Sequence, residues 1–394
     1  MVKVNNINWG HFIAFSFCFF MFFIPDYLVN TFPLLSTFFD YLRIIVFLVL
    51  YFYSLIFKNN VKLSLPLVLI PILYFILLCV TLYYKGPYLG VITEFFRVYA
   101  PFFFIFLFYS IDAYTLSYSL STLLFIFLML NTISIFLYPN GMYVTISQAG
   151  WLGNESWFLG FKNGFASYIF LSIASFYFLF KTCNKKTSLY IFLILVNIAN
   201  CLLISFLSSS STCLFSVLFF IFTYILLKEA KKFPKRHQLF FYRLIFYIIF
   251  AVSVLFLIFP SDSLISIVAN LFNKDSYSLL SRVSIWDNTK NYVFMSPIFG
   301  FGNESSLIIV DKIGQINSHN TLLWITYRGG FISLFIFLTL IIKLARYHLK
   351  NRSPVECSIL LAIIIMCTTE VMINPMISAL IALLFNIKKD SLYE

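Results

Sequence analysis

Long apolar runs alternate with short polar intervals along almost the whole chain. At about 20 residues each, the runs are long enough to cross the hydrocarbon core of a bilayer as helices. A membrane β-barrel would instead need strands with a period of two, and no such alternation is visible. The pattern predicts an all-α polytopic membrane protein with about twelve transmembrane helices (roughly 11–13). The expected spans are 9–28, 39–57, 63–83, 91–110, 116–137, 163–180, 189–206, 209–227, 241–259, 319–342, 355–373 and 375–387.

The composition excludes a water-soluble class. Hydrophobic residues make up 61% of the 394 residues and charged residues only 11%, which a soluble domain could not hold without large exposed apolar patches. The net charge of +12 would raise nucleic acid as a partner, but the basic residues fall in short segments that alternate with nearly uncharged ones. This is the positive-inside pattern, so we expect both termini in the cytoplasm and no nucleic-acid partner.

Several kinds of site are not expected. The seven cysteines lie within or at the ends of apolar runs without a C-x-x-C pair, so we expect neither disulfides nor zinc. The chain has no P-loop, Rossmann glycine pattern or H-E-x-x-H, and the sequence therefore predicts no cofactor and no metal. The first apolar run lacks a small-residue cleavage site after it, which favours an uncleaved span over a signal peptide.

Two predicted external loops, 138–162 and 260–318, interrupt what we expect to be a single membrane domain over residues 1–394. The larger loop carries balanced charges, so its arginines and lysines need an explanation other than topology. Within it, 282–295 predicts a short amphipathic helix at the membrane interface, with aromatic residues such as Trp286. We expect Ser281 to cap this helix, which would put Arg282 beside a helix N-terminus suited to phosphate.

Beyond this helix the same loop has a proline and a glycine pair. Pro297 is expected to end the helix, since proline cannot continue it. Gly300 and Gly302 would permit close approach of the backbone to a bound molecule.

Of the four histidines, only His319 is predicted on the outer side. It lies at the mouth of a span between Ser318 and Asn320, which could orient the ring. Because imidazole titrates near neutral pH, it suits a general base. The alternative is a histidine that only caps the helix at the interface.

Arg282 and Arg328 bracket this histidine in the sequence. A diphosphate leaving group needs permanently charged, delocalised donors, which arginine supplies. The structural alternatives are a surface pair with Asp287 for Arg282, and an intramembrane pair with Glu370 or Glu94 for Arg328.

Three further polar residues lie near predicted outer ends of spans. Arg97 is costly within a span unless it has a use, and the alternative is neutralisation by Glu94 three residues earlier. Lys162 and Asn163, at the mouth of the sixth span, could contact a sugar or phosphate. The alternative for Lys162 is snorkelling to the interface.

The run 208–212 is expected to be a tight, serine-rich turn.

Four motifs within residues 281–330 resemble the O-antigen ligase and polymerase superfamily in order and spacing. The chain looks most like a Wzy-type polymerase of O-antigen, capsular or exopolysaccharide repeat units. The motifs are Ser281-Arg282-x-x-Ile285-Trp286, Pro297-x-x-Gly300-x-Gly302, Ser318-His319-Asn320 and Tyr327-Arg328-Gly329-Gly330.

The resemblance implies a GT-C-like membrane glycosyltransferase in the bacterial cytoplasmic (inner) membrane, with its active site facing outward. Its substrates would be undecaprenyl-diphosphate-linked oligosaccharides, and the reaction would be metal-independent and inverting. His319 matches the proposed base of the family, and Arg282 matches a loop arginine proposed to hold the diphosphate. Further candidate substrate ligands are Arg328, Arg97, Lys162, Asn163, Asn320, Trp286, Gly300 and Gly302.

One family feature is missing. Many relatives carry an arginine beside the small-residue turn that corresponds to 208–212, and this chain has none there. A second phosphate ligand must then come from elsewhere, with Arg97, Arg328 and Lys162 as candidates.

Two other functions fit the same sequence. One is an O-antigen-ligase-type transferase that attaches finished glycan to a different acceptor. The other is a flippase or transporter for lipid-linked oligosaccharides, which would be expected to show internal repeats and midplane charges on broken helices. For the polymerase, membrane lipid, a flippase and a chain-length regulator are candidate partners.

Overall fold

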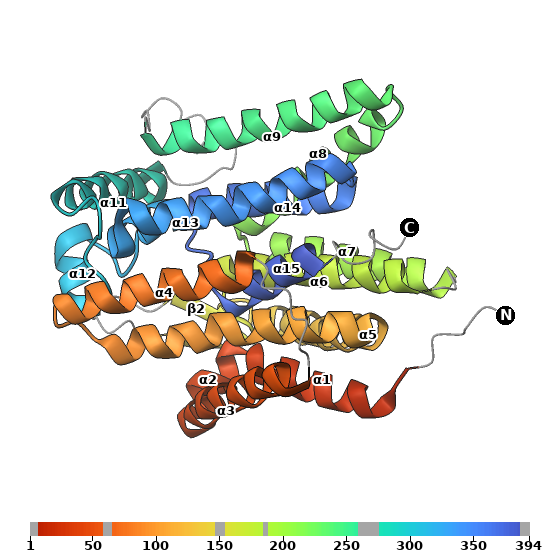
Figure 1. The fold of residues 1–394 in the computed structure, drawn as a ribbon, viewed down its shortest axis with the longest axis horizontal. Coiled ribbons are helices and arrows are strands. Elements are labelled where there is room, and N and C mark those ends of the chain that lie inside the picture. The colour runs from red at the N-terminus through yellow and green to blue at the C-terminus, as the bar shows by residue number, and fades with distance from the viewer. Residues whose placement is uncertain (1–6, 58–64, 146–153, 184–187, 259–275, 387–394) are drawn as a thin grey trace.

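The computed structural model describes residues 7–57, 65–145, 154–183, 188–258 and 276–386. Most of the helices lie side by side along the long axis of the molecule (Figure 1). The helices are α1 (Trp9–Phe22), α2 (Asp26–Thr31), α3 (Pro33–Phe57), α4 (Leu65–Tyr83), α5 (Tyr88–Leu137), α6 (Phe165–Thr182), α7 (Ser188–Leu207), α8 (Ser211–Ala230), α9 (Lys235–Ile258), α11 (Ser276–Met295), α12 (Ser306–Ile313), α13 (Thr321–Asn351), α14 (Pro354–Thr369) and α15 (Pro375–Asn386).

The predicted membrane class is confirmed. Within the described residues, 7 helices are long and apolar enough to cross a bilayer, and α1, α7, α14 and α15 are shorter apolar helices. One of the seven, α5, has 50 residues, which at about 1.5 Å per residue is far longer than one crossing. The figure of twelve spans stays a prediction.

A break at Asp112 divides α5 into two segments. The backbone dihedrals there (φ −149°, ψ 75°) are not helical. Both segments pack along α1, since Phe104 contacts Phe15 in the first and Ser119 donates to the Phe12 carbonyl from the second. The two segments correspond to the predicted spans 91–110 and 116–137.

The predicted start of the helix in the larger loop is wrong. The helix expected at 282–295 begins at Ser276, so Ser281 does not cap it and Arg282 does not lie at its N-terminus. The smaller loop holds an antiparallel sheet of β1 (Tyr143–Thr145), β2 (Asn154–Trp157) and β3 (Gly160–Phe161), followed by the short helix η1 (Lys162–Gly164). Residues 259–275 of the larger loop lie outside the described residues.

A kink in α13 joins it to the segment 297–302. At Gly330 the backbone has φ 66°, and the Tyr327 and Arg328 carbonyls accept from the Phe301 and Gly302 amides at 2.9 and 2.7 Å. The Phe331 amide donates to the Pro297 carbonyl at 2.7 Å. The loop thus replaces hydrogen bonds that the kink removes from the helix, which satisfies the buried backbone groups.

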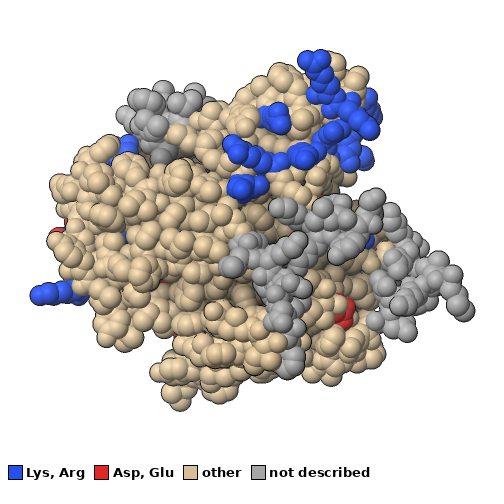
Figure 2. All heavy atoms as spheres, in the orientation of Figure 1, with Lys and Arg blue, Asp and Glu red and all other residues tan. Residues whose placement is uncertain are grey.

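Basic side chains gather at one end of the molecule, where α8 and α9 meet (Figure 2). The helices α11 and α12 lie at the opposite end (Figure 1). The positive-inside pattern would put this basic end in the cytoplasm, and that orientation stays a prediction.

The kink generates a stability prediction. A Cβ at residue 330 would lie 1.9 Å from the Ile298 carbonyl oxygen, so Gly330→Ala must displace the segment 297–302. Gly314 also has a positive φ (82°), but a Cβ there meets nothing within 4 Å. We expect Gly314→Ala to cost only about 1–2 kcal/mol of left-handed strain and Gly330→Ala clearly more, measured as thermal unfolding midpoints in detergent. Equal shifts for the two variants would show that the loop does not hold the kink.

Candidate active site

The site is built around an interruption between two helices near the C-terminus. α14 ends at Thr369, and Glu370 has extended dihedrals (φ −148°, ψ 161°); α15 starts only at Pro375. Thr321, the first residue of α13, donates its hydroxyl to the Glu370 carbonyl at 2.7 Å and accepts the Met372 amide at 2.8 Å. The start of α13 therefore fixes the backbone on both sides of this interruption.

The Glu370 carboxylate accepts hydrogen bonds from three distant parts of the chain. Its Oε1 accepts from Asn163 Nδ2 at 2.7 Å and from Arg282 Nη2 at 2.9 Å. Its Oε2 lies 3.3 Å from His319 Nδ1. The carboxylate is 11% exposed, so these donors compensate the loss of its hydration.

Sequence reasoning missed this role of Glu370. The sequence analysis treated Glu370 as a possible ion-pair partner for Arg328, and not as a partner of His319 or Arg282. The available signal was an isolated acid inside an apolar run, five residues before Pro375. An ionisable residue within a membrane span is costly and marks a functional site by default.

His319 is held in a strained turn that aims its ring at Glu370. Its φ of 47° lies in the left-handed region, which non-glycine residues adopt only when their surroundings stabilise it. The His319 amide donates to Asn317 Oδ1 at 2.9 Å, and the Ser318 hydroxyl donates to the Asn320 carbonyl at 2.8 Å. The side chain is 26% exposed, and its Nε2 has no hydrogen-bond partner in the described part of the chain.

The neighbours of His319 act on the backbone and not on the ring, so that part of the prediction is wrong. Asn320 caps α13, with Oδ1 accepting the Leu323 amide at 3.0 Å, and donates Nδ2 to the Thr368 carbonyl at 2.9 Å. Trp286 is buried and donates Nε1 to the Ser318 carbonyl at 2.9 Å. Asn320 and Trp286 therefore position the histidine turn.

Arg282 reaches the site from the second turn of α11. Its Nη1 donates to the Thr369 carbonyl and its Nη2 to Glu370, both at 2.9 Å. The alternative pair with Asp287 is wrong, because Asp287 pairs with Lys290 at 2.6 Å. The Arg282 side chain is 22% exposed, and a guanidinium has five N–H donors, so donors remain for an anion.

Asn163 is the predicted ligand that the fold brings to the same carboxylate. Its Oδ1 accepts from the Ser210 hydroxyl at 3.3 Å, and Ser210 caps α8 by accepting the Cys213 amide at 3.4 Å. The serine-rich turn thus lies beside the site. The neighbouring Lys162 is partly buried and forms no ion pair within the described ranges.

Arg328 does not contact Glu370. It forms a bidentate pair with Glu94, with Nη1–Oε1 and Nη2–Oε2 distances of 2.9 and 2.8 Å, and Tyr74 donates to the same carboxylate at 3.2 Å. The Arg328 side chain is only 4% exposed. The alternative of a pair with Glu94 is confirmed, and a substrate role for Arg328 stays a prediction.

Arg97 pairs with Asp40 and not with Glu94, so the expected neutralisation within its own helix is wrong. Its Nε and Nη2 lie 2.9 and 2.5 Å from the two carboxylate oxygens, and Arg43 donates to the same carboxylate. The Arg97 side chain is nonetheless 47% exposed. It lines a cavity of about 290 Å³ that also borders Asp26, Gly164 and Asn374.

This cavity lies next to the Glu370 site, because Gly164 follows Asn163 and Asn374 follows the Glu370 interruption. Asp26 and Arg97 both line the cavity, and both are exposed. The cavity is thus polar, and it contains one accessible guanidinium.

The glycine pair approaches the protein itself. A Cβ at Gly300 would lie 2.5 Å from the Tyr327 carbonyl oxygen, and one at Gly302 would lie 2.7 Å from the Thr81 backbone. In this structure the close approach expected for a bound molecule is made by α13 and α4.

These features define a class: a polytopic membrane protein with a partly buried histidine, arginine and carboxylate at the end opposite its basic surface. Residues 193–338 match the Wzy_C family, described as O-Antigen ligase. The match contains Arg282 and His319, whereas Asn163 and Glu370 lie outside it. It confirms the predicted relationship to the O-antigen ligase and polymerase superfamily, whose members are glycosyltransferase-like membrane enzymes. No curated protein matches the sequence.

The Arg328–Glu94 pair generates a second prediction. Glu94→Gln leaves a buried guanidinium without its counter-charge and should cost about 3 kcal/mol of stability, whereas the double variant Glu94→Leu/Arg328→Leu should lie close to the wild type. Asp287→Asn, in the more exposed pair with Lys290, should change stability by less than about 0.5 kcal/mol. Thermal unfolding in detergent measures all three.

Glycan transfer by the double variant then tests the substrate role. Activity near the wild-type level would assign Arg328 to structure alone. Loss of activity in a stable double variant would support Arg328 as a substrate ligand.

Proposed function

We propose that the protein is a polysaccharide polymerase. It transfers a growing glycan from undecaprenyl diphosphate to a hydroxyl of the next lipid-linked repeat unit, on the outer face of the bacterial cytoplasmic membrane. The observation that carries the proposal is the convergence of His319 and Arg282 on the Glu370 carboxylate. A base and a cation for a leaving group are the two requirements of this reaction.

In the proposed reaction His319 Nε2 accepts the proton of the acceptor hydroxyl. The hydroxyl oxygen attacks the anomeric carbon, and the bond from that carbon to the diphosphate oxygen breaks, so a single displacement inverts the anomeric configuration. Glu370 holds the proton on Nδ1, which leaves Nε2 as the acceptor, and its charge stabilises the imidazolium that forms.

Arg282 neutralises the charge that develops on the diphosphate. Glu370 and the Thr369 carbonyl fix its guanidinium plane, so the arginine is oriented before the substrate binds. Arg97 supplies a second contact to phosphate or sugar from the adjoining 290 Å³ cavity. It would take the place of the arginine that is missing beside the serine-rich turn.

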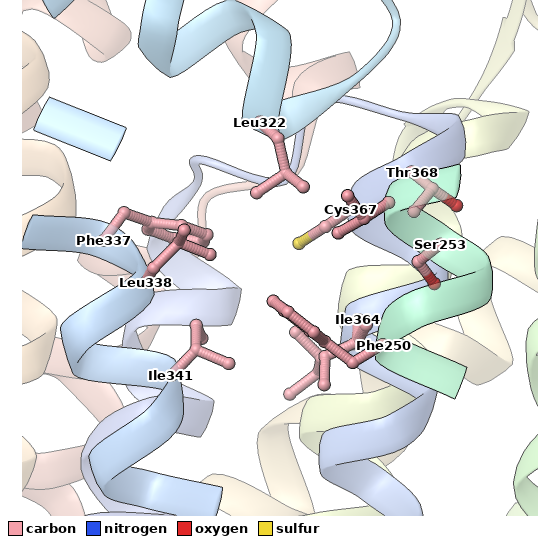
Figure 3. Close-up of a pocket in the computed structure, with 11 residues that line it drawn as sticks. Phe250, Ser253, Leu322, Phe337, Leu338, Ile341, Ile364, Cys367 and Thr368 are labelled. Carbon is pink, nitrogen blue, oxygen red and sulfur yellow. The ribbon is translucent and has the colours of Figure 1, made fainter. Parts of the chain in front are cut away.

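A small apolar cavity of about 20 Å³, enough for about one water molecule, lies near the site. It lies between α9, α13 and α14 (Figure 3). Leu322 and Thr368 line this cavity. Leu322 directly follows Thr321, and Thr368 directly precedes Thr369, so the cavity adjoins the site. This cavity is too small for a polyprenyl chain. Since many α9 side chains are exposed, we propose that the polyprenyl chain lies in the lipid against this helix while its diphosphate reaches Arg282.

The match to a family described as O-antigen ligase favours a second candidate. A ligase would use the same base and the same leaving group with a different acceptor. Glycan from a deletion strain separates the two: loss of polymer length supports the polymerase, and loss of final attachment supports the ligase.

The proposal predicts the effects of removing each catalytic group. Purified protein in nanodiscs receives undecaprenyl-diphosphate-linked repeat units, without nucleotide or metal, and polymer is measured on gels. His319→Ala and Arg282→Ala should each reduce the rate by at least about 100-fold. His237→Ala and Arg243→Ala remove the same residue types from exposed positions on α9 and should leave the rate unchanged.

Two outcomes would refute the proposal. Either both site variants polymerise at the wild-type rate, or the wild type makes no polymer and instead carries the substrate across a sealed bilayer, as a flippase would.

Glu370 is expected to act through its neighbours. Glu370→Gln keeps the shape of the side chain but loses its charge, and it should reduce turnover by about 10- to 100-fold with a smaller effect on KM, as loss of an orienting partner does. Glu229→Gln, in an exposed pair with Lys232, is the matched control. An unchanged turnover in Glu370→Gln would contradict the positioning role.

A further inference from the structure

A larger cavity opens at the basic end of the molecule. It has a volume of about 680 Å³ and lies where α6, α8 and α13 end and α14 begins. Three lysines and an arginine line it, with a single acidic residue among them. These residues are Lys181, Lys228, Lys231, Arg352 and Glu356.

Most of the positive charge in this cavity is not compensated. Glu356 is 1% exposed, lies 3.8 Å from Lys181 and accepts from the Tyr177 hydroxyl at 3.0 Å. Lys228, Lys231 and Arg352 have no ion-pair partner within the described ranges. The acid nearest in the sequence to Lys228 and Lys231 is Glu229, which is already paired with Lys232 at 2.5 Å.

Two polar atoms buried in this region lack partners. They are Oε2 of Glu356 and Nε of Arg352, neither of which has a hydrogen bond. Arg352 also has a left-handed backbone (φ 51°) at the C-terminus of α13. Unsatisfied buried groups are rare in native structures, and each calls for a missing partner. A ligand that brings both acceptors and a donor would satisfy them.

The simplest alternative is that these lysines only set topology. Topological lysines need only project into water beside a span. Lys228 and Lys231 instead border a cavity together with Tyr177 and Tyr224, from helices that are distant in sequence. The end of α8 and the turn to α9 form part of the basic surface in Figure 2.

We propose that this cavity binds a phosphate group, and that anionic phospholipid supplies it. Lysines bind phosphate as point charges, and tyrosine hydroxyls add hydrogen bonds. Basic pockets between transmembrane helices on the cytoplasmic side recognise phosphorylated headgroups. The position of the cavity among helix ends puts a bound phosphate at headgroup level, and its volume exceeds that of a single phosphate.

The proposed site is separate from the Glu370 site but is built on the same four helices. Each of α6, α8, α13 and α14 has one end at the cavity and its other end beside Asn163, Ser210, His319 or Glu370. Bound lipid would therefore hold these helices together and stabilise the folded protein.

Thermal unfolding of the full chain in neutral detergent tests the proposal. Phosphatidylglycerol, phosphatidylcholine, inorganic phosphate and pyrophosphate are each titrated against the wild type. Lys228→Gln/Lys231→Gln removes two charges that line the cavity. The control variant Lys232→Gln/Lys235→Gln removes two charges from the neighbouring turn that do not line the cavity. Both variants therefore lose the same amount of non-specific attraction between anions and the basic end.

We expect phosphatidylglycerol to raise the unfolding midpoint of the wild type and of the control in a saturable way. The cavity variant should need at least about tenfold more lipid for the same shift. Phosphatidylcholine should have little effect. Stabilisation by the inorganic anions alone, lost only in the cavity variant, would support the phosphate site with a soluble anion as its source.

Two results would overturn the proposal. One is equal weakening in the cavity variant and the control, which would reduce the effect to the charge of the whole surface. The other is no stabilisation by any of the anions. These readouts require no glycan transfer, so they stand independently of the proposed polymerase activity.

Discussion

The architecture of the site depends on one partly buried carboxylate. Glu370 sits where the chain leaves α14, at 11% exposure, and an ion in that position costs several kcal/mol unless its lone pairs are satisfied. Asn163, Arg282 and His319 satisfy them from η1, from α11 and from the turn before α13. The same contacts that compensate the carboxylate also bring the His319 imidazole and the Arg282 guanidinium to one side chain, where the proposed reaction needs a base and a cation. Stability and chemistry are therefore coupled at this residue.

The rest of the bundle makes this arrangement rigid. Thr321 and Asn320 fasten the start of α13 to the interruption between α14 and α15. About two helical turns further along, Arg328 connects α13 to α5 through its pair with Glu94. The 297–302 segment replaces the hydrogen bonds lost at the Gly330 kink. A histidine with a positive φ needs such support, because its strain must be offset by its surroundings. The motif residues without a direct contact to Glu370 thus act as its scaffold.

Sequence patterns predicted the helical membrane class and assigned His319 and Arg282 to the same side of the membrane. Hydropathy and charge bias are strong signals in a chain that spans a bilayer. The sequence patterns offered the Arg328–Glu94 pair as one of two alternatives but did not predict the other long-range pairings. Glu370 lies 51 residues from His319 and 88 from Arg282, and Arg97 reaches Asp40 across 57 positions. Helical spacing reveals only neighbours three or four residues apart, which is why Glu94 was wrongly paired with Arg97. Gly300 and Gly302 indicated a close approach to the backbone at these positions, but the sequence did not show that helices of the same protein would make it.

The most direct test of this account is a cryo-EM structure of the protein with a non-cleavable analogue of a lipid-diphosphate-linked sugar. The account predicts diphosphate oxygens within hydrogen-bond distance of Arg282. Glu370 should still be bound to His319 Nδ1. His319 Nε2 should face the anomeric carbon, with enough space between them for the acceptor hydroxyl. A diphosphate bound at the basic end, or a His319 ring turned away from Glu370 with Nε2 buried in protein, would contradict it.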